Sequence, residues 1–317
     1  MAQFTIYRSS DVGAPVLNGI TGSLITVLDA VLVNGYGSQT NAGWAKPYSS
    51  SDNMYAAYQQ GPGSSSCYMW VQDTGSVASG KEAIFRGYET LTSIFGGTGS
   101  LTHPFPNSIQ SVLTSNGLAI RKCNTTHSLS SSAWIAAADS RGLYFFAKTG
   151  DVANTYFSFA FGDIYSYIPN DPYKCAIIGR STENIATLAG DNIFTINGLV
   201  IAGLVGNYIQ RSFSGTGVST NIGKHVDGVR NNAGAANLSA GTYVFPNPAD
   251  GKIYLSPVWI TDNGTLRGQM RGFYNLGHTW ASLNDGDVFS GSAELAGKTF
   301  LTVKSPGYII ETSNTLE

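Results

Sequence analysis

The densest group of side chains with chemical potential lies in the stretch NIGKHVDGVR, residues 221–230. An imidazole beside a carboxylate can move protons, so His225 and Asp227 are candidates for an acid–base pair. The same stretch, with Lys224 and Arg230, also suits a polar contact surface, because charged groups give such surfaces their specificity. We favour the second interpretation and predict that these four residues make subunit contacts from a long polar loop, residues 213–241.

The known sequence signatures of catalysis and metal binding are missing from the chain. None of the four histidines (His103, His127, His225 and His278) has another histidine at the short spacing of a zinc clip. No glycine-rich phosphate loop with a following Lys and Ser or Thr occurs, and GRSTE around Ser181 lacks the last glycine of a nucleophile elbow. The sequence therefore predicts a protein that is not an enzyme, with no catalytic residues, no cofactor and no metal.

Aromatic side chains are the other candidates for binding, since Tyr and Trp combine an apolar ring with a polar group and can stack on sugars or partner proteins. Trp44 lies in AGWAKPYS, within a stretch from residue 34 to 61 whose glycines and serines indicate a loop. We therefore predict that Trp44 is exposed.

The elements that must position these residues are mostly strands. Short runs of Val, Ile, Tyr, Phe and Trp alternate with turn residues, a pattern typical of antiparallel sheets in a sandwich or a barrel-like form. The clearest hairpins are those around residues 67–89, 132–151, 252–277 and 297–314. The chain divides into β-rich domains 1–180 and 181–317, or forms one large domain.

One segment has the period of a helix. In residues 23–34, Leu24, Leu28, Val31 and Leu32 share one face, Ser23 can cap the start, and Asn34-Gly35 suits the end. Little of this helix is polar, so we expect it to be buried within its own chain.

Composition limits the classes of function. Charged residues make up 12% of the chain, against about 25% in a typical soluble protein, and the net charge is −2. This balance argues against broad nucleic-acid binding. Low charge suits a subunit whose surface is covered by neighbours, although a β protein with many polar loops has the same composition.

The cysteines and hydropathy indicate where the protein is made. Cys67, Cys123 and Cys175 are too far apart for a metal motif and are odd in number, so we expect buried or semi-buried free thiols in a reducing cytoplasm. The start, MAQFTIYRSS, lacks the features of a secretion signal, and no apolar run is long enough to cross a bilayer.

The N-terminal segment SSDVGAPVLNGITGSLITVLDAVLVNGYGSQTNAGWAKPYSS resembles a signature of virion structural proteins encoded by tailed bacteriophages and prophages. Its elements are Asp-x-Gly-Ala-Pro-x-Leu, a helix, Leu-Val-Asn-Gly-Tyr-Gly and Ala-Gly-Trp, and later segments such as FRGYETL, FGDIYSY, FPNPADG and RGFYNLGH extend the likeness along the chain. The resemblance implies a virion protein made and assembled in the host cytoplasm, and it brings no catalytic residues.

The function that we predict is a non-enzymatic structural subunit of the virion, in the tail, neck or baseplate, whose partners are other virion proteins and copies of itself. The alternative is a module on the virion that binds a host receptor or surface glycan. Capsid decoration is a further alternative, and so is a tail depolymerase, although no β-solenoid repeat is visible.

Overall fold

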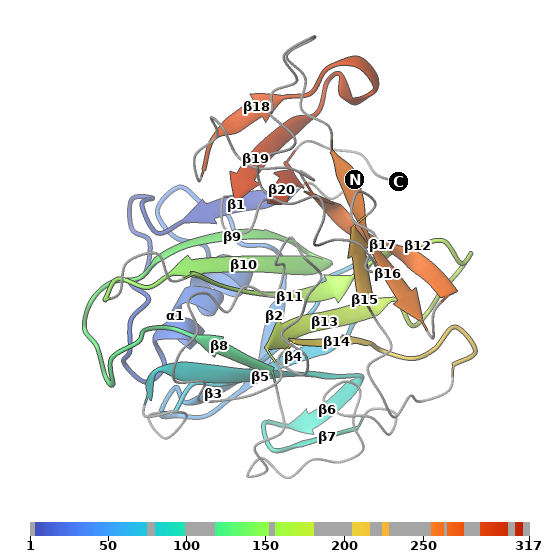
Figure 1. Ribbon diagram of the computed structural model, residues 1–317. Helices are drawn as coiled ribbons and strands as arrows, with labels where there is room; N and C mark the ends of the chain where they lie inside the picture. Colours follow the sequence, from blue (N-terminus) through green and yellow to red (C-terminus); the bar gives the residue numbers. More distant parts are fainter. Residues whose placement is uncertain are drawn as a thin grey trace.

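The computed structural model describes residues 4–74, 80–98, 118–151, 156–180, 205–215, 224–227, 255–262, 265–275, 286–303 and 308–312. This part of the chain is mainly β, its sheets pack like a sandwich, and one short helical segment lies near the N-terminus (Figure 1). Every strand pair that is described is antiparallel. The predicted fold class is confirmed, with the sandwich form rather than a closed barrel.

Eleven strands form the larger sheet, in the order β1-β9-β10-β11-β13-β8-β5-β4-β3-β2, with β14 beside β13. Their bounds are β1 Thr5–Arg8, β2 Ala45–Ser49, β3 Tyr55–Gln59, β4 Tyr68–Gln72, β5 Glu82–Tyr88, β8 Leu118–Arg121, β9 Ala133–Asp139, β10 Gly142–Lys148, β11 Tyr156–Asp163, β13 Cys175–Arg180 and β14 Val205–Ile209.

Seven strands form the second sheet, in the order β15-β16-β17-β20-β19-β18, with β12 beside β17. Their bounds are β12 Tyr165–Ser166, β15 Lys224–Asp227, β16 Ser256–Asp262, β17 Thr265–Asn275, β18 Val288–Ser290, β19 Thr299–Val303 and β20 Tyr308–Glu311. A small hairpin joins β6 Thr90–Ser93 to β7 Gly96–Thr98, and a 3₁₀ turn, η4, spans Ala293–Leu295.

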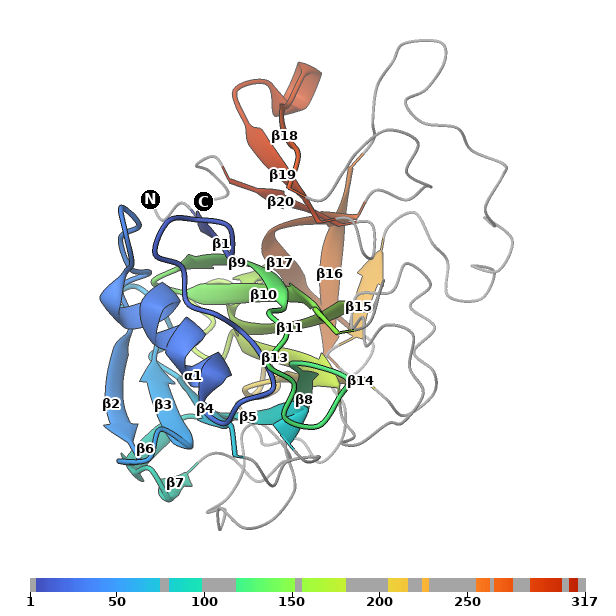
Figure 2. The same ribbon diagram turned by 90° about the vertical axis from the view of Figure 1, so that its left-hand side faces the viewer.

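The predicted helix covers the expected residues in two forms, the α-helix α1 (Ser23–Leu28) and the π-helical turn η1 (Asp29–Asn34). The helix lies between the two ends of the larger sheet (Figure 2). Its buried residues belong to the same core cluster as Tyr7 of β1, at one end of the sheet, and Tyr58 of β3, near the other end. The expected intrachain burial is therefore confirmed, and the helix fills the inside of a curved sheet.

Residues outside this helix form hydrogen bonds with the backbone groups at both of its ends. The predicted cap by Ser23 is wrong, because Gly22 holds the N-cap position and the Ser23 hydroxyl donates to the Asn18 carbonyl oxygen. The Asp73 carboxylate instead accepts the Leu24 N–H at 2.8 Å. At the other end Gly35 has a positive φ, as expected, and Ala42 N–H and Trp44 N–H donate to the carbonyl oxygens of Val31 and Leu32.

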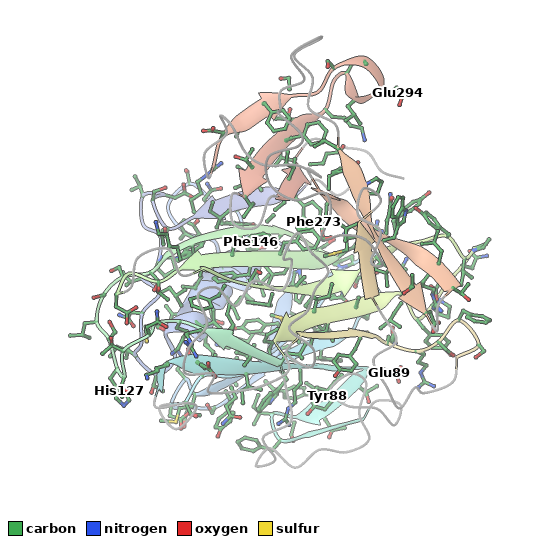
Figure 3. The ribbon with its side chains drawn as sticks, in the orientation of Figure 1. Tyr88, Glu89, His127, Phe146, Phe273 and Glu294 are labelled. Carbon is green, nitrogen blue, oxygen red and sulfur yellow. The ribbon has the colours of Figure 1, made fainter. Side chains whose placement is uncertain are left out.

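The second sheet packs on the side of β10 that faces away from the helix. The rings of Phe146 and Phe273 stack across the two sheets with centroids 6.3 Å apart (Figure 3), and the Tyr144 hydroxyl donates to the Arg271 carbonyl oxygen. The Arg271 guanidinium forms an ion pair with Asp139 at the end of β9. Apolar and ionic contacts together thus join the two sheets.

The predicted hairpins all occur, as β4–β5, β9–β10, β16–β17 and β19–β20. The loop interpretation of residues 34–61 is wrong in part, because β2 and β3 form a further hairpin there. Pairings also cross residue 180, since β14 adds to β13 and β12 pairs with β17. A division into domains at that residue stays a prediction.

The three cysteines are free and buried, as expected. Burial raises the pKa of the Cys175 thiol well above its usual value, and the neighbouring Cys67 adds to this shift. Across the described residues, no helix has the length and apolar character needed to pass through a membrane.

Candidate assembly surface

The polar cluster predicted to make contacts is only partly described. Lys224, His225 and Asp227 belong to β15, where their Cα atoms pair with those of Thr261, Ile260 and Val258 of β16. The prediction of one long loop is therefore wrong at these residues, which form a strand of the second sheet. Arg230 lies outside the described residues, and so does most of the remaining stretch 213–241.

Trp44 is buried, with 4% of its surface exposed, so the prediction of an exposed ring is wrong. Its indole N–H donates to the Asp139 carbonyl oxygen at 2.6 Å, and its ring lies 5.9 Å from that of Phe161. The physical reason is the curvature of the larger sheet, which brings the start of β2 against the end of β9. Trp44 fills the gap between them.

The segment between β1 and α1, residues 9–22, is held to the body of the protein by polar contacts. The Asp11 carboxylate accepts hydrogen bonds from the Arg8 N–H, the Tyr36 hydroxyl at 2.9 Å and the Gln39 amide. Burial and the nearby Asp11 charge raise the pKa of Tyr36 well above its usual value. The Tyr36 hydroxyl therefore stays protonated and keeps donating to Asp11.

Glycines allow this segment to lie close to the end of the helix. Gly37 has a φ of 53°, and a Cβ atom there would lie 2.2 Å from the Val12 carbonyl oxygen. Gly13 has a φ of 81° and faces Gly37. The Gly-Ala-Pro and Asn-Gly-Tyr-Gly parts of the sequence signature thus meet in space, and their shared role is to fold this segment.

A second segment, residues 124–132, runs beside the first. Leu17 pairs with Ser132, and the Gly19 N–H donates to the Ser128 carbonyl oxygen at 2.8 Å. Figure 2 shows the first segment passing beside α1 on the face of the molecule that it presents. The two segments thus form adjoining parts of one outer layer.

This layer exposes four large apolar side chains, which we call the apolar strip: Val12, Val16, Ile20 and Leu129. Val12 is 90% exposed and Leu129 is 75% exposed. Single exposed apolar residues are common, but several on adjoining segments are typical of a contact surface. The candidate site that the structure supports best is therefore a surface for assembly with another protein.

Sequence reasoning did not find the apolar strip. Its signal is present, since Val12, Val16 and Ile20 stand at equal spacing among glycine, proline and asparagine, where no strand or helix can bury them. In the sequence, these residues were considered only as part of the segment that resembles phage virion proteins.

Several of the charged side chains form ion pairs inside the protein. Side-chain ion pairs that are almost fully buried are Arg121–Glu82, Lys122–Asp73, Arg267–Asp171, Arg267–Asp262 and Arg271–Asp139. Since the chain has only 18 basic and 20 acidic residues, these pairs leave still fewer charges for the surface. The surface is therefore left with fewer charged side chains than the composition alone suggests.

Comparison with known proteins gives no relative from which a role can be transferred. No protein-family model matches the chain, and none of the curated proteins is significantly similar to it.

Proposed function

We propose that this chain is a non-enzymatic structural subunit of a tailed-bacteriophage particle, placed in the tail, neck or baseplate. The apolar strip is the observation that carries the proposal, because it offers a second protein an apolar surface on a rigid support. The resemblance of the N-terminal segment to phage virion proteins supplies the kind of particle.

The apolar strip gains free energy when a neighbour covers it. Removing apolar surface from water is worth about 25 cal/mol per Å², and each exposed Val, Ile or Leu contributes to that gain. The strip is also well ordered before contact, since Asp11, Tyr36 and the pairing of Leu17 with Ser132 hold its segments in place. Little further ordering is needed on association, which favours a stable interface.

The pairing of the buried acidic groups supports a structural role. Asp73, Asp139, Asp171 and Asp262 each contact a buried Lys or Arg, and Asp139 and Asp171 also accept hydrogen bonds from nearby turns. A carboxylate held in this way fixes neighbouring segments. These groups stabilise the fold that presents the strip.

The proposal can be tested by placing charge on the apolar strip. We expect the double variant Val12→Lys/Leu129→Lys to fold as well as the parent, because both side chains are exposed, but to be lost from particles. The measurement is the amount of the chain in particles purified from cells that carry the encoding phage or prophage. Burying two unpaired ammonium groups in an interface costs several kcal/mol, roughly a loss of a thousandfold or more in affinity.

Leu266→Lys is the matched control, since Leu266 is also exposed but lies on β17 of the second sheet. We expect this variant to enter particles normally. Normal incorporation of the double variant, with unchanged thermal stability, would show that the apolar strip is not an assembly surface.

A further inference from the structure

Three aromatic side chains and one buried amide lie together on one face of the second sheet, and we call them the aromatic shelf: Tyr165, Tyr167, Trp259 and Gln269. Gln269 of β17 pairs with Tyr165 of β12 on one side and with Trp259 of β16 on the other. Residues that are directly opposite on neighbouring strands project from the same face of a sheet. Val258 and Ile260, the neighbours of Trp259 in sequence, are buried on the other face.

The rings and the amide are joined by hydrogen bonds. The Trp259 indole N–H donates to the Tyr167 hydroxyl, which in turn donates to the Gln269 side-chain oxygen, both at 3.2 Å. The Tyr167 and Tyr165 rings meet edge to face with centroids 5.9 Å apart. Tyr167 is 43% exposed, and Tyr165 and Trp259 are partly exposed, so the shelf presents its rings to solvent in a fixed arrangement.

A buried ion network holds the shelf from below. The Arg267 side chain donates to both oxygens of Asp171, at 2.8 and 2.7 Å, and to Asp262 at 2.9 Å. The Tyr167 N–H also donates to the Arg267 carbonyl oxygen. These contacts join the chain after β12 to the β16–β17 hairpin, and Figure 1 shows β12 beside β16 and β17. The rings are therefore held in position before any ligand binds.

Gly268 shows how closely β12 is fitted against β17. A Cβ atom at this position would lie 2.1 Å from the Tyr165 carbonyl oxygen, so only glycine allows the approach. This glycine is what lets Tyr165 and Tyr167 lie next to Trp259.

We infer that the aromatic shelf is a binding site for a neutral carbohydrate. A sugar ring has an apolar face, which stacks on aromatic rings, and a rim of hydroxyl groups, which hydrogen-bond to polar groups such as the exposed Tyr167 hydroxyl. None of the four shelf residues is an Asp, Glu, Lys, Arg or His, and Arg267 beneath them is engaged by two aspartates. This neutrality favours a neutral sugar over an anionic one.

The inference goes beyond the proposed function and does not depend on it, because the shelf and the apolar strip lie on different elements. On a virion subunit, the same site would add recognition of a cell-surface glycan to a structural role.

The test uses the full chain and a panel of neutral oligosaccharides: maltohexaose, cellohexaose, mannohexaose, chitohexaose and galactohexaose. We expect the parent to bind at least one of them in calorimetry, and Trp259→Ala and Tyr167→Ala to weaken that binding about tenfold or more. Trp259→Phe should retain part of the affinity, since it keeps a ring for stacking. Thermal unfolding of each variant shows that the fold is kept.

Phe95→Ala is the matched control, because Phe95 is an exposed ring in the turn of the separate β6–β7 hairpin, where it packs edge to face on Tyr55. This variant should bind as the parent does. Absence of binding to every sugar of the panel, or equal binding by the parent and the folded Trp259→Ala variant, would overturn the inference. Loss of another virion protein from the Trp259→Ala particles, without sugar binding by the parent, would assign the shelf to a protein contact and overturn it as well.

Discussion

Replacing Lys122 with methionine is expected to lower the free energy of unfolding by about 3–5 kcal/mol. Lys122 is fully buried, where its ammonium group contacts the Asp73 carboxylate and donates to the Ile20 carbonyl oxygen at 2.9 Å. Asp73 in turn accepts the N–H of Leu24 at the start of α1. Methionine keeps the volume of the side chain but leaves the Asp73 charge buried without its cation.

Denaturant unfolding of the parent and variant measures this effect. Lys46→Met is the matched control, because Lys46 also forms an ion pair, with Asp29, but both side chains are partly exposed to solvent. A pair of this kind is worth about 1 kcal/mol or less. Equal destabilisation by the two variants would show that the buried pair does not hold the start of the helix.

The loss in Lys122→Met should also become smaller at acidic pH. Burial already raises the pKa of Asp73, while Lys122 opposes that shift. Without Lys122 the pKa of Asp73 rises further in the folded state, whereas it stays at about 3.9 in the unfolded chain. At a pH between these two pKa values, Asp73 of the variant is protonated in the folded state and ionised in the unfolded state. Lowering the pH through this range therefore stabilises the folded variant relative to the parent.

Leu28→Asp is expected to have the other large effect. Leu28 has no exposed surface and belongs to the core cluster that includes Tyr7, Tyr58 and Phe145. A buried carboxylate without a partner costs several kcal/mol, which is a large share of a total stability of about 5–15 kcal/mol. We expect the variant to unfold at far lower denaturant concentration or to accumulate as insoluble protein.

Two further variants give this prediction its controls. Leu28→Ala should remain folded and its free energy of unfolding should fall by about 2–5 kcal/mol. This variant therefore gives a measurement at the same site even if the aspartate variant does not fold. Leu266→Asp places the charge at an exposed leucine of β17 and should change stability little. If Leu28→Asp melted like the parent, the helix would not be part of the core.

The helix and the hairpins were predictable because their signals are local. Leu24, Leu28, Val31 and Leu32 repeat with the helical period, and each hairpin is flanked by strand-forming residues around a turn. The strand β3 was not predicted because the glycines and serines of residues 34–61, within which YAAYQ lies, are typical of a loop. Its pairing with β4 depends on the sheet and not on its own composition.

The contacts that complete the fold could not be predicted because they join distant residues. Asp73 caps a helix 49 positions earlier in the chain, and Trp44 donates to a carbonyl 95 positions later. The aromatic shelf has the same origin, since Tyr167 and Trp259 meet only after β12 has docked on β17. In each case the residue types were visible, but their partners depend on strand order.

The central claim is that the chain is a fixed component of a phage particle, and counting it in purified particles tests this most directly. Particles from an induced lysate are banded by density, and quantitative mass spectrometry gives the ratio of this chain to the major capsid protein. The account predicts a constant ratio in every preparation that survives high salt, as for a subunit held by apolar contacts. A chain that stays with the soluble lysate proteins, or whose ratio falls towards zero on further purification, would contradict it.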